Sequence, residues 1–398
     1  MKKMNFTTII TILLIIVSVV LCSVMSKDKI ESTFATTSAT ADEKSDEEMR
    51  GLWVSFISLD MSGTGRTYNE FKSKFDKILS TAKDFGCNTL IVQVRPFCDA
   101  LYKSEIFPAS HILSGIQGNN PGYDALEYMC ERTHSAGLKI HAWINPYRVA
   151  TSESPEHLSE NNPYIMDNTL GVELSSGIYL NPAKKAVRKL IADGVAEIVN
   201  NYEVDGIQFD DYFYPADFGD ADNEEYISYQ KSVNNITKAM YKKEWRENNV
   251  NLMLTQVYNR IKEIDESVVF GISPQGNIEN NYNMGADVKV WCENIGYADY
   301  ICPQMYYSLD NPTLKFEVSL QEWKEFFFHK KLKVYIGIGA YKAGTEADKG
   351  TWLDNENILA TQVYLLRRYG YDGFMIYDYS AFESETAQKE LQNLKSIL

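Results

Sequence analysis

The sequence has few of the residues that usually hold a metal ion or a disulfide framework. Its 398 residues include only six cysteines and five histidines. The cysteines form no CxxC pair and the histidines form no HExxH or HxH pair, so the spacing of a zinc site is lacking. We therefore expect no metal and no other cofactor. Buried free thiols are the expected state of Cys87, Cys98, Cys130, Cys292 and Cys302.

Basic residues are also scarce, because 39 Lys and Arg stand against 54 Asp and Glu and give a net charge of -15. Nucleic acids and anionic membrane surfaces are bound through basic patches, so this balance disfavours both partners. Aromatic residues are plentiful by contrast, with 26 Tyr and 6 Trp. Most of these rings will fill the core, but sugar-binding sites also use such rings, and a polysaccharide partner fits this composition.

The first 48 residues differ from the rest of the chain. Lys2 and Lys3 precede an apolar run from Ile9 to Met25, which is the layout of a secretory signal or a signal anchor. We predict a signal peptide or signal anchor over residues 1–26, a flexible linker over 27–48 and one domain over 49–398. The domain is then extracytoplasmic, either secreted or anchored to the outer face of the cytoplasmic membrane by the N-terminal segment alone.

From Met49 onward, short apolar runs alternate with amphipathic stretches of helical period, which is the pattern of repeated βα units. Eight strands are predicted, at Gly51–Ile57, Thr89–Arg95, Lys139–Asn145, Gly206–Asp211, Val269–Ser273, Tyr300–Met305, Lys333–Gly339 and Gly373–Tyr377. Helices are predicted at Tyr68–Phe85, Ala125–Ala136, Ala183–Tyr202, Glu224–Asn248, Leu320–His329 and Asn355–Tyr369. The predicted fold is a single α/β domain, a (β/α)8 TIM barrel whose site lies at the carboxyl ends of its strands. Its two longest connections are expected after the third strand, over 147–182, and after the fourth, over 212–223.

The face of each strand that points into the barrel is unusually polar. If the Ile, Val and Leu positions face the outer helices, alternation places a polar layer inside. This layer comprises Gln93, Arg95, His141, Trp143, Asn145, Gln208, Asp210, Gly271, Ser273, Gln275, Gln304, Tyr306, Gly339, Tyr341, Tyr377 and Tyr379. Barrel interiors are normally filled with branched apolar residues, so a polar upper layer indicates a polar ligand. A purely structural hydrogen-bond network is the alternative, and His141 taken alone fits a satisfied core histidine better than a ligand.

The segment from Asp205 to Pro215 carries the candidate catalytic residues. It places Asp210 and Asp211 directly before three aromatic residues, at the end of a short buried strand. Glycosidic cleavage commonly needs two carboxyl groups that flank the bond. Alternation predicts that Asp210 points into the barrel, so Asp210 is the candidate for one of these two carboxyl groups. Asp211 is favoured for the other although its parity is outward, and the alternatives are Asp378, Glu279 and Asp217.

Arg95 is the one cation that alternation places inside the barrel, and an unpaired buried charge is costly. Pairing with Asp210 is favoured and would keep that carboxylate ionised, whereas an anionic substrate group facing Arg95 would leave Asp210 free to act as the acid. Aromatic residues at the strand ends are expected to stack on sugar rings. The candidates for substrate binding are Arg95, Trp143, Asn145, Tyr147, Arg148, Tyr212, Tyr214, Gln275, Gln304, Tyr306, Tyr341 and Tyr377.

Six motifs carry a resemblance to a known family. They are the segments Met49–Ser55, Gln93–Pro96, His141–Arg148, Asp205–Pro215, Gly271–Gly276 and Asp299–Tyr306. Together, and in that family's order, they resemble the bacterial glycosyl hydrolase-like family 10 from about Met49 to the end of the chain. The resemblance implies a TIM-barrel glycosidase, and the characterised relatives cut glycan strands of peptidoglycan in the cell envelope.

The segment from Asp205 to Pro215 is also similar to family 18 chitinases, in which the catalytic acid lies two residues beyond the position of Asp210. Here that residue is Tyr212, so the chitinase assignment fails at its central residue, although participation by a substrate N-acetyl group stays open. We expect a cell-envelope glycoside hydrolase that acts on peptidoglycan or a related surface polysaccharide. The alternatives are a barrel that binds glycan without cutting it and a metal-dependent deacetylase-type hydrolase, because a fold does not fix chemistry.

Overall fold

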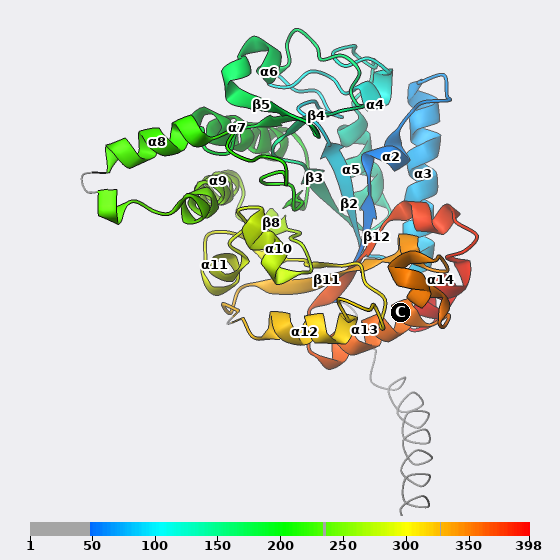
Figure 1. The fold of residues 1–398 in the computed structure, drawn as a ribbon. Coiled ribbons are helices and arrows are strands. Elements are labelled where there is room, and N and C mark those ends of the chain that lie inside the picture. Colours follow the sequence, from blue (N-terminus) through cyan, green and yellow to red (C-terminus); the bar gives the residue numbers. More distant parts are fainter. Residues whose placement is uncertain (1–47, 234–235, 327) are drawn as a thin grey trace, which may run out of the picture. The chain divides into compact units, whose positions relative to one another are not determined.

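Eight parallel strands close into a barrel in the computed structural model, which describes residues 48–233, 236–326 and 328–398 (Figure 1). The last strand pairs with the first, so every barrel strand is paired on both sides. In barrel order the strands are β1 (Met49–Val54), β2 (Thr89–Arg95), β3 (Lys139–Ile144), β7 (Gly206–Phe209), β8 (Val269–Ile272), β9 (Tyr300–Ile301) with β10 (Gln304–Met305), β11 (Lys333–Gly339) and β12 (Gly373–Tyr377). The predicted (β/α)8 barrel is confirmed. The predicted signal or anchor, almost all of the linker, and Cys22 lie outside the described residues.

Helices follow every strand and cover the barrel from outside. The main ones are α3 (Tyr68–Phe85), α5 (Ala125–Ser135), α7 (Lys185–Asn201), α9 (Lys242–Ile264), α11 (Val288–Glu293), α12 (Phe316–Lys324), α13 (Ile358–Arg368) and α14 (Gln388–Lys395). Local signals set their ends, as in α3. There the Thr67 side chain accepts from the Glu70 amide at the start, and Gly86 takes the left-handed conformation, with φ of 102°, at the end. The shorter helices are α2 (Phe56–Leu59), α4 (His111–Ser114), α6 (Pro163–Met166), α8 (Asn223–Ser232) and α10 (Ile278–Asn283).

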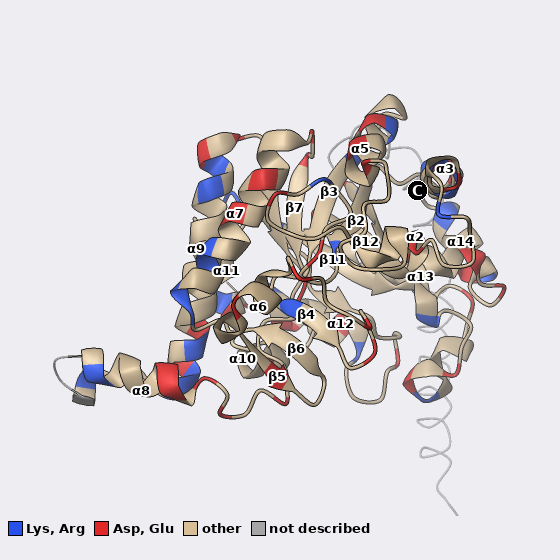
Figure 2. Ribbon diagram, turned by 90° about the horizontal axis from the view of Figure 1, so that it is seen from above, with Lys and Arg blue, Asp and Glu red and all other residues tan. Residues whose placement is uncertain are grey.

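The predicted helix over 224–248 is wrong. It is divided into α8 and α9, and α9 continues to Ile264. A new helix start is capped before α9, where the backbone N–H of Tyr241 donates to Glu244 Oε2 at 3.2 Å. No glycine or proline stands between Ser232 and Lys242, so the sequence does not mark the break. In Figures 1 and 2, α8 projects away from the barrel.

The strands alternate as predicted over most of their length. The outward face packs Ile, Val, Leu and Phe side chains against the helices in one continuous core. The inward face holds a second, smaller apolar cluster, made by Trp53, Ile91, Trp143, Tyr300, Cys302 and Met375. Figure 2 shows the strands mostly free of charge, with both signs of charge gathered on helices and loops.

Three connections at the carboxyl ends of the strands are long. The predicted one after β3 folds into an antiparallel sheet of β4 (Arg148–Thr151), β6 (Gly177–Leu180) and β5 (Gly171–Leu174). The predicted one after β7 runs over 210–222 up to α8, and a further one follows β2 over 96–124. Many side chains of this last connection are buried, among them Phe97, Leu101 and Phe107, so it packs as part of the core.

The described part of the chain holds no helix both long and apolar enough to cross a bilayer. The five cysteines in it are free and buried, as expected.

Candidate active site

Asp210 and Asp211 both reach the carboxyl end of the barrel. Strand β7 ends at Phe209, so strand alternation no longer separates the two side chains. Asp210 Oδ2 accepts hydrogen bonds from Trp143 Nε1 at 3.0 Å and from Asn145 Nδ2 at 3.2 Å. The outward parity expected of Asp211 is therefore wrong, because this residue lies beyond the pleated strand.

Asp211 is held from the other side of β7, where β8 is the neighbouring strand. Its Oδ1 accepts from Gln304 Nε2 at 2.9 Å, and its Oδ2 accepts from Gln275 Nε2. Gln275 and Gln304 lie at the ends of β8 and β10 and pair with each other in an isolated β-bridge. The two neighbouring carboxyl groups thus have different partners, drawn from β3 on one side and from β8 and β10 on the other.

The two carboxyl groups also differ in how well their oxygens are satisfied. Asp210 is 3% exposed, and its Oδ1 is buried without a hydrogen-bond partner among the described residues. Burial, together with the charge of Asp211, raises the pKa of Asp210 to about 7, against the opposing effects of Arg148 and the Trp143 hydrogen bond. Burial also raises the pKa of Asp211, and hydrogen bonds from Gln304 and Gln275 oppose that rise. Near neutral pH Asp210 can therefore hold a proton on Oδ1, the oxygen without a partner among the described residues.

The prediction that Arg95 points into the barrel is wrong. The pairing of β2 with β3 shifts between Gln93 and Arg95, so that Arg95 lies opposite Ile144, an outward residue. A shift of one residue turns a side chain to the other face of a sheet. The guanidinium of Arg95 lies 4.5 Å from the centre of the Phe107 ring and close to Gly194 of α7, outside the barrel. The expected pairing with Asp210 therefore does not form.

Arg148 provides the positive charge that Arg95 was expected to provide. It is the first residue of β4, and its Nε donates to the carbonyl of Pro96 at 2.9 Å. Its guanidinium lies over three aromatic rings, those of Phe97 at 4.9 Å, Tyr212 at 5.6 Å and Phe56 at 5.9 Å. Its charge lowers the pKa of both Asp210 and Asp211. Arg148 is thus a partly exposed cation beside two buried carboxyl groups.

The aromatic rim contains four of the predicted tyrosines. Tyr306 and Tyr377 stack at 5.0 Å between ring centres, and Tyr341 meets both of them edge-on. Tyr212 is 49% exposed, and Tyr341 is also exposed. Together these rings offer apolar faces next to the carboxyl groups.

Two tyrosines predicted for the rim are buried instead. Tyr147 is fully buried and packs against Phe213, while Tyr214 is 1% exposed and packs between Phe218 and Arg246. Both therefore lie in the core, where they cannot stack on a sugar.

Asp378 lies at another part of the ring of strand ends. Its Oδ2 accepts from Ser55 Oγ, at the end of β1, at 2.9 Å, and its Oδ1 accepts from Ser380 Oγ. Both oxygens are satisfied, and no hydrogen bond joins Asp378 to Asp210 or Asp211 among the described residues. Asp217 is similarly occupied, because it accepts from Ser175 and Ser176 in the turn between β5 and β6.

The lower part of the inward polar layer is a structural network. Gln208 accepts from Trp53 Nε1 at 2.9 Å, and Gln93 accepts from the Phe56 amide at 3.1 Å. His141 Nδ1 lies 3.0 Å from the Tyr300 hydroxyl, and burial lowers the pKa of His141 to about 4, so the ring is neutral. His141 is the satisfied core histidine that we predicted.

Sequence reasoning missed Trp53, Phe56 and Phe97. Trp53 is an inward residue of β1, and alternation with Leu52 and Val54 would have revealed it. Phe56 begins α2 and Phe97 lies in the connection after β2, and no sequence pattern shows that they flank Arg148. Among the described residues, no three His, Cys, Asp or Glu side chains are grouped so as to hold a metal ion.

A model of the glycosyl hydrolase-like 10 family matches residues 48–354 of the chain. The chain belongs to the glycosyl hydrolase-like 10 family. The resemblance seen in the six motifs is confirmed, and so is the expected class of enzyme, a glycosidase.

Two curated relatives agree with this family. The chain is 33% identical over 339 residues to glycosyl hydrolase YngK of Bacillus subtilis, a match that covers 79% of this chain and 65% of that protein. It is thus similar to slightly less than two thirds of YngK. It is 31% identical over 386 residues to glycosyl hydrolase DigH of Escherichia coli K12, covering 87% of this chain and 86% of DigH.

Solved structures with the same fold are more distant in sequence. The glycoside hydrolase domain of PgaB (BpsB) from Bordetella bronchiseptica superposes with a TM-score of 0.59 at 11% identity, covering 87% of this chain and 99% of that one. A beta-galactosidase from Bacillus circulans gives a TM-score of 0.56 at 8% identity, covering 88% of this chain and 55% of that one. At such identities the likeness shows the fold alone.

Proposed function

We propose that the protein hydrolyses glycan strands of the cell envelope, in peptidoglycan or a related surface polysaccharide. Asp210 is the general acid and Asp211 is the second carboxyl group. The observation that carries this proposal is the difference between the two neighbours. Burial raises the pKa of both, but Asp210 has a buried oxygen without a partner among the described residues, whereas Asp211 has both oxygens held by amide donors that oppose the rise. A pair of acids in unlike environments is typical of glycosidases.

The chemistry follows from where each carboxyl group keeps its proton. Protonated Asp210 transfers its proton to the glycosidic oxygen as the bond to the anomeric carbon breaks. Trp143 and Asn145 hold Oδ2, so Oδ1 is the oxygen left to carry the proton. Asp211 accepts hydrogen bonds on both oxygens, an arrangement that favours the ionised form and supports the positive charge developing on the sugar.

The surroundings of the carboxyl groups support a glycan that carries an anionic group. Arg148 is a partly exposed cation at the same barrel end, next to the exposed ring of Tyr212. A carboxylate, such as the lactyl group of a muramic residue freed of its peptide, can pair with its guanidinium. Tyr212, Tyr341, Tyr306 and Tyr377 supply apolar ring faces for neighbouring sugars.

We also propose that the domain works outside the cytoplasm. The apolar run that follows Lys2 and Lys3 supports export, because it has the form of a secretory signal or anchor. Fractionation of cells that produce the full chain tests this part independently of the enzyme's chemistry. Recovery of the protein in the cytosol alone would contradict it.

The test of function is product analysis. Purified glycan strands of peptidoglycan, with and without their peptides, are incubated with the full-length protein, and the products are separated by mass. We expect shorter saccharides with new reducing ends and no loss of acetyl groups, in the presence or absence of a chelator. Binding to strands without new reducing ends would support the non-catalytic barrel instead, and chelator-sensitive release of acetate would support a metal-dependent deacetylase.

A further inference from the structure

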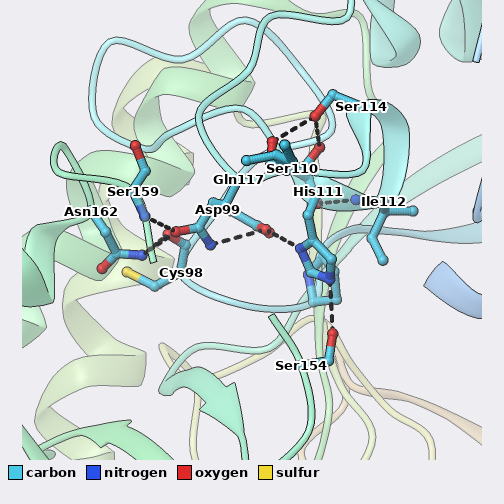
Figure 3. Close-up of polar contacts among 12 residues, drawn as sticks. Cys98, Asp99, Ser110, His111, Ile112, Ser114, Gln117, Ser154, Ser159 and Asn162 are labelled. Atoms are coloured by element: carbon cyan, nitrogen blue, oxygen red, sulfur yellow. Dashed lines mark hydrogen bonds and ion pairs between the residues drawn. The ribbon is translucent and has the colours of Figure 1, made fainter. Parts of the chain in front are cut away.

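Asp99, His111 and Ser154 form a line of two hydrogen bonds (Figure 3). Asp99 Oδ2 lies 3.1 Å from His111 Nδ1, and His111 Nε2 lies 2.9 Å from Ser154 Oγ. Asp99 and His111 belong to the connection after β2, and Ser154 belongs to the connection after β3. The order of contacts is the order found in serine hydrolases, which are recognised by this geometry and not by sequence position.

The acid at one end of the line is fixed in place. Asp99 is fully buried, and its Oδ2 also accepts from Gln117 Nε2 at 3.2 Å. Gln117 is in turn held through its Oε1, which accepts from Asn162 Nδ2 at 3.1 Å and from the Ser159 amide at 3.0 Å (Figure 3). Further hydrogen bonds thus stop the Asp99 carboxylate from turning away from the imidazole.

The imidazole is oriented for general-base work. An ionised carboxylate only accepts hydrogen bonds, so the Nδ1 that faces Asp99 carries the proton in the neutral ring. Nε2 is then left to accept from the Ser154 hydroxyl. The ring also packs against Phe97, with 5.3 Å between the ring centres.

The accessible end of the line is the serine. The His111 side chain is 14% exposed and Ser154 is half-buried, whereas Asp99 is closed to solvent. Phe97 links this group to the candidate active site, because the guanidinium of Arg148 lies over the same ring. The Phe97 ring is thus in contact with both His111 and the Arg148 guanidinium.

We propose that Ser154 is the nucleophile of a second hydrolytic site, with His111 as its base and Asp99 as the residue that orients the base. Its substrate is an acyl ester, and the assignment of that ester to a hydroxyl of the bound glycan rests on the proposed function above. The glycosidase pair uses none of these three residues. The serine site therefore adds an esterase activity to the glycosidase.

The step is an acyl transfer in two halves. Ser154 Oγ bonds to the acyl carbon while His111 Nε2 takes the hydroxyl proton, and the ester C–O bond then breaks as His111 returns that proton to the leaving sugar oxygen. A water molecule, deprotonated by His111, next attacks the acyl-serine. The products are a free sugar hydroxyl and a carboxylic acid, and Ser154 is restored.

The test uses two probes that require no glycan. The full-length protein is treated with a fluorophosphonate, the modified peptide is identified by mass spectrometry, and hydrolysis of p-nitrophenyl acetate is followed in parallel. We expect one phosphonyl group on Ser154 and ester turnover that falls by ~10²-fold or more in Ser154→Ala and His111→Ala. Ser152→Ala is the matched control, because Ser152 is an exposed serine two residues earlier, and it should behave as wild type.

Labelling of the wild-type protein does not depend on any variant being stable. It should also persist in Asp210→Asn, so a failure of the glycosidase proposal would not remove it. An unlabelled Ser154, or ester turnover equal in wild type and Ser154→Ala, would overturn the proposal. A lower melting temperature in Ser154→Ala with unchanged ester turnover would likewise overturn it, since the three residues would then only join two loops.

Discussion

The indole of Trp143 donates a hydrogen bond of 3.0 Å to Asp210 and thereby joins the inner face of β3 to the residue that follows β7. The bond is buried, and it engages Oδ2 while Oδ1 stays without a partner among the described residues. Because the donor favours the ionised carboxylate, it lowers the pKa of Asp210 against the larger effect of burial. Trp143 therefore sets the pH range over which Asp210 can act as an acid.

Replacing Trp143 with Phe removes this donor and keeps an aromatic ring. Hydrogen bonds to charged groups are worth roughly 1.5–3 kcal/mol, so the pKa of Asp210 should rise by about one to two units. A general acid that keeps its proton to higher pH moves the alkaline limb of the pH-rate profile upward. Trp352→Phe is the control, because Trp352 Nε1 donates to Asp348 Oδ2 at 3.0 Å, a carboxylate that bonds neither Asp210 nor Asp211. If the alkaline limb of the pH-rate profile of Trp143→Phe stays in place or moves to lower pH, this role of Trp143 is contradicted.

The burial of Asp210 predicts a stability that depends on pH. Its pKa lies near 7 in the folded protein and near 3.8 in an ordinary environment, so folding favours its protonated form. The stability that this group contributes is fully present below about pH 4 and is lost as the pH rises to about 7. Asn cannot ionise, so the Asp210→Asn variant does not lose this stability as the pH rises. The free energy of unfolding of Asp210→Asn, relative to wild type, should therefore increase by a few kcal/mol between pH 4 and pH 7 and then level off.

Denaturant titrations at pH 4, 5, 7 and 8 check this prediction. Asp217→Asn is a control of opposite sign, because hydrogen bonds from Ser175 and Ser176 lower the pKa of Asp217. The stability that Asp217 contributes is present at neutral pH and lost as the pH falls, so its variant should be weakened most at neutral pH. A difference between Asp210→Asn and wild type that does not vary with pH would show that Asp210 is ionised in the folded protein.

Arg148 and Arg95 should respond differently to the same substitution. The charge of Arg148 lowers the pKa of both site carboxyl groups, so Arg148→Met should raise both and move the pH-rate profile to higher pH. It should also weaken binding of carboxylate-bearing glycan more than binding of neutral oligosaccharides. Arg95→Met should leave the profile in place, because Arg95 packs on Phe107 outside the barrel. A shifted profile in Arg95→Met together with an unshifted one in Arg148→Met would contradict the assignment.

The two tyrosines of the loop after β7 have separable roles. Tyr212 is exposed, so Tyr212→Ala should weaken the binding of long oligosaccharides by roughly 1–2 kcal/mol and change stability little. Tyr214 is buried against Phe218, so Tyr214→Ala should lower the free energy of unfolding by about 3–5 kcal/mol while the folded protein binds normally. Calorimetric titration with oligosaccharides and thermal melts measure the two effects. Lower stability with normal binding in Tyr212→Ala, together with weaker binding and normal stability in Tyr214→Ala, would contradict these positions of the two rings.

Much of the barrel could be predicted because local signals agree with the fold. Strands β2, β11 and β12 and helix α3 have the predicted bounds, since runs of β-branched residues and a glycine cap mark them in the sequence itself. The inward Trp143, Gln208 and Asp210 followed from alternation alone. These features depend on neighbours within a few residues of each other.

The residues that were misplaced depend on contacts distant in sequence. Arg95 lies outside the barrel because the pairing of β2 with β3 shifts by one residue, and alternation within β2 does not reveal that shift. Tyr147 and Tyr214 were predicted to lie at the rim because they follow predicted strands, but the structure buries both side chains. Asp99, His111 and Ser154 come from two separate loops, and no spacing in the sequence indicates that they meet.

The central claim is that Asp210 donates the proton to the leaving sugar oxygen, and leaving-group dependence tests it most directly. Turnover of glycan strands and of a dinitrophenyl glycoside, whose leaving group needs no proton, is compared in wild type, Asp210→Asn, Asp211→Asn and Asp378→Asn. Loss of the general acid should lower strand cleavage in Asp210→Asn by ~10²-fold or more while its cleavage of the activated glycoside falls far less. Asp211→Asn should lose both activities, and Asp378→Asn should keep most of each. Equal losses on both substrates in Asp210→Asn, or strand cleavage near the wild-type rate, would contradict the claim.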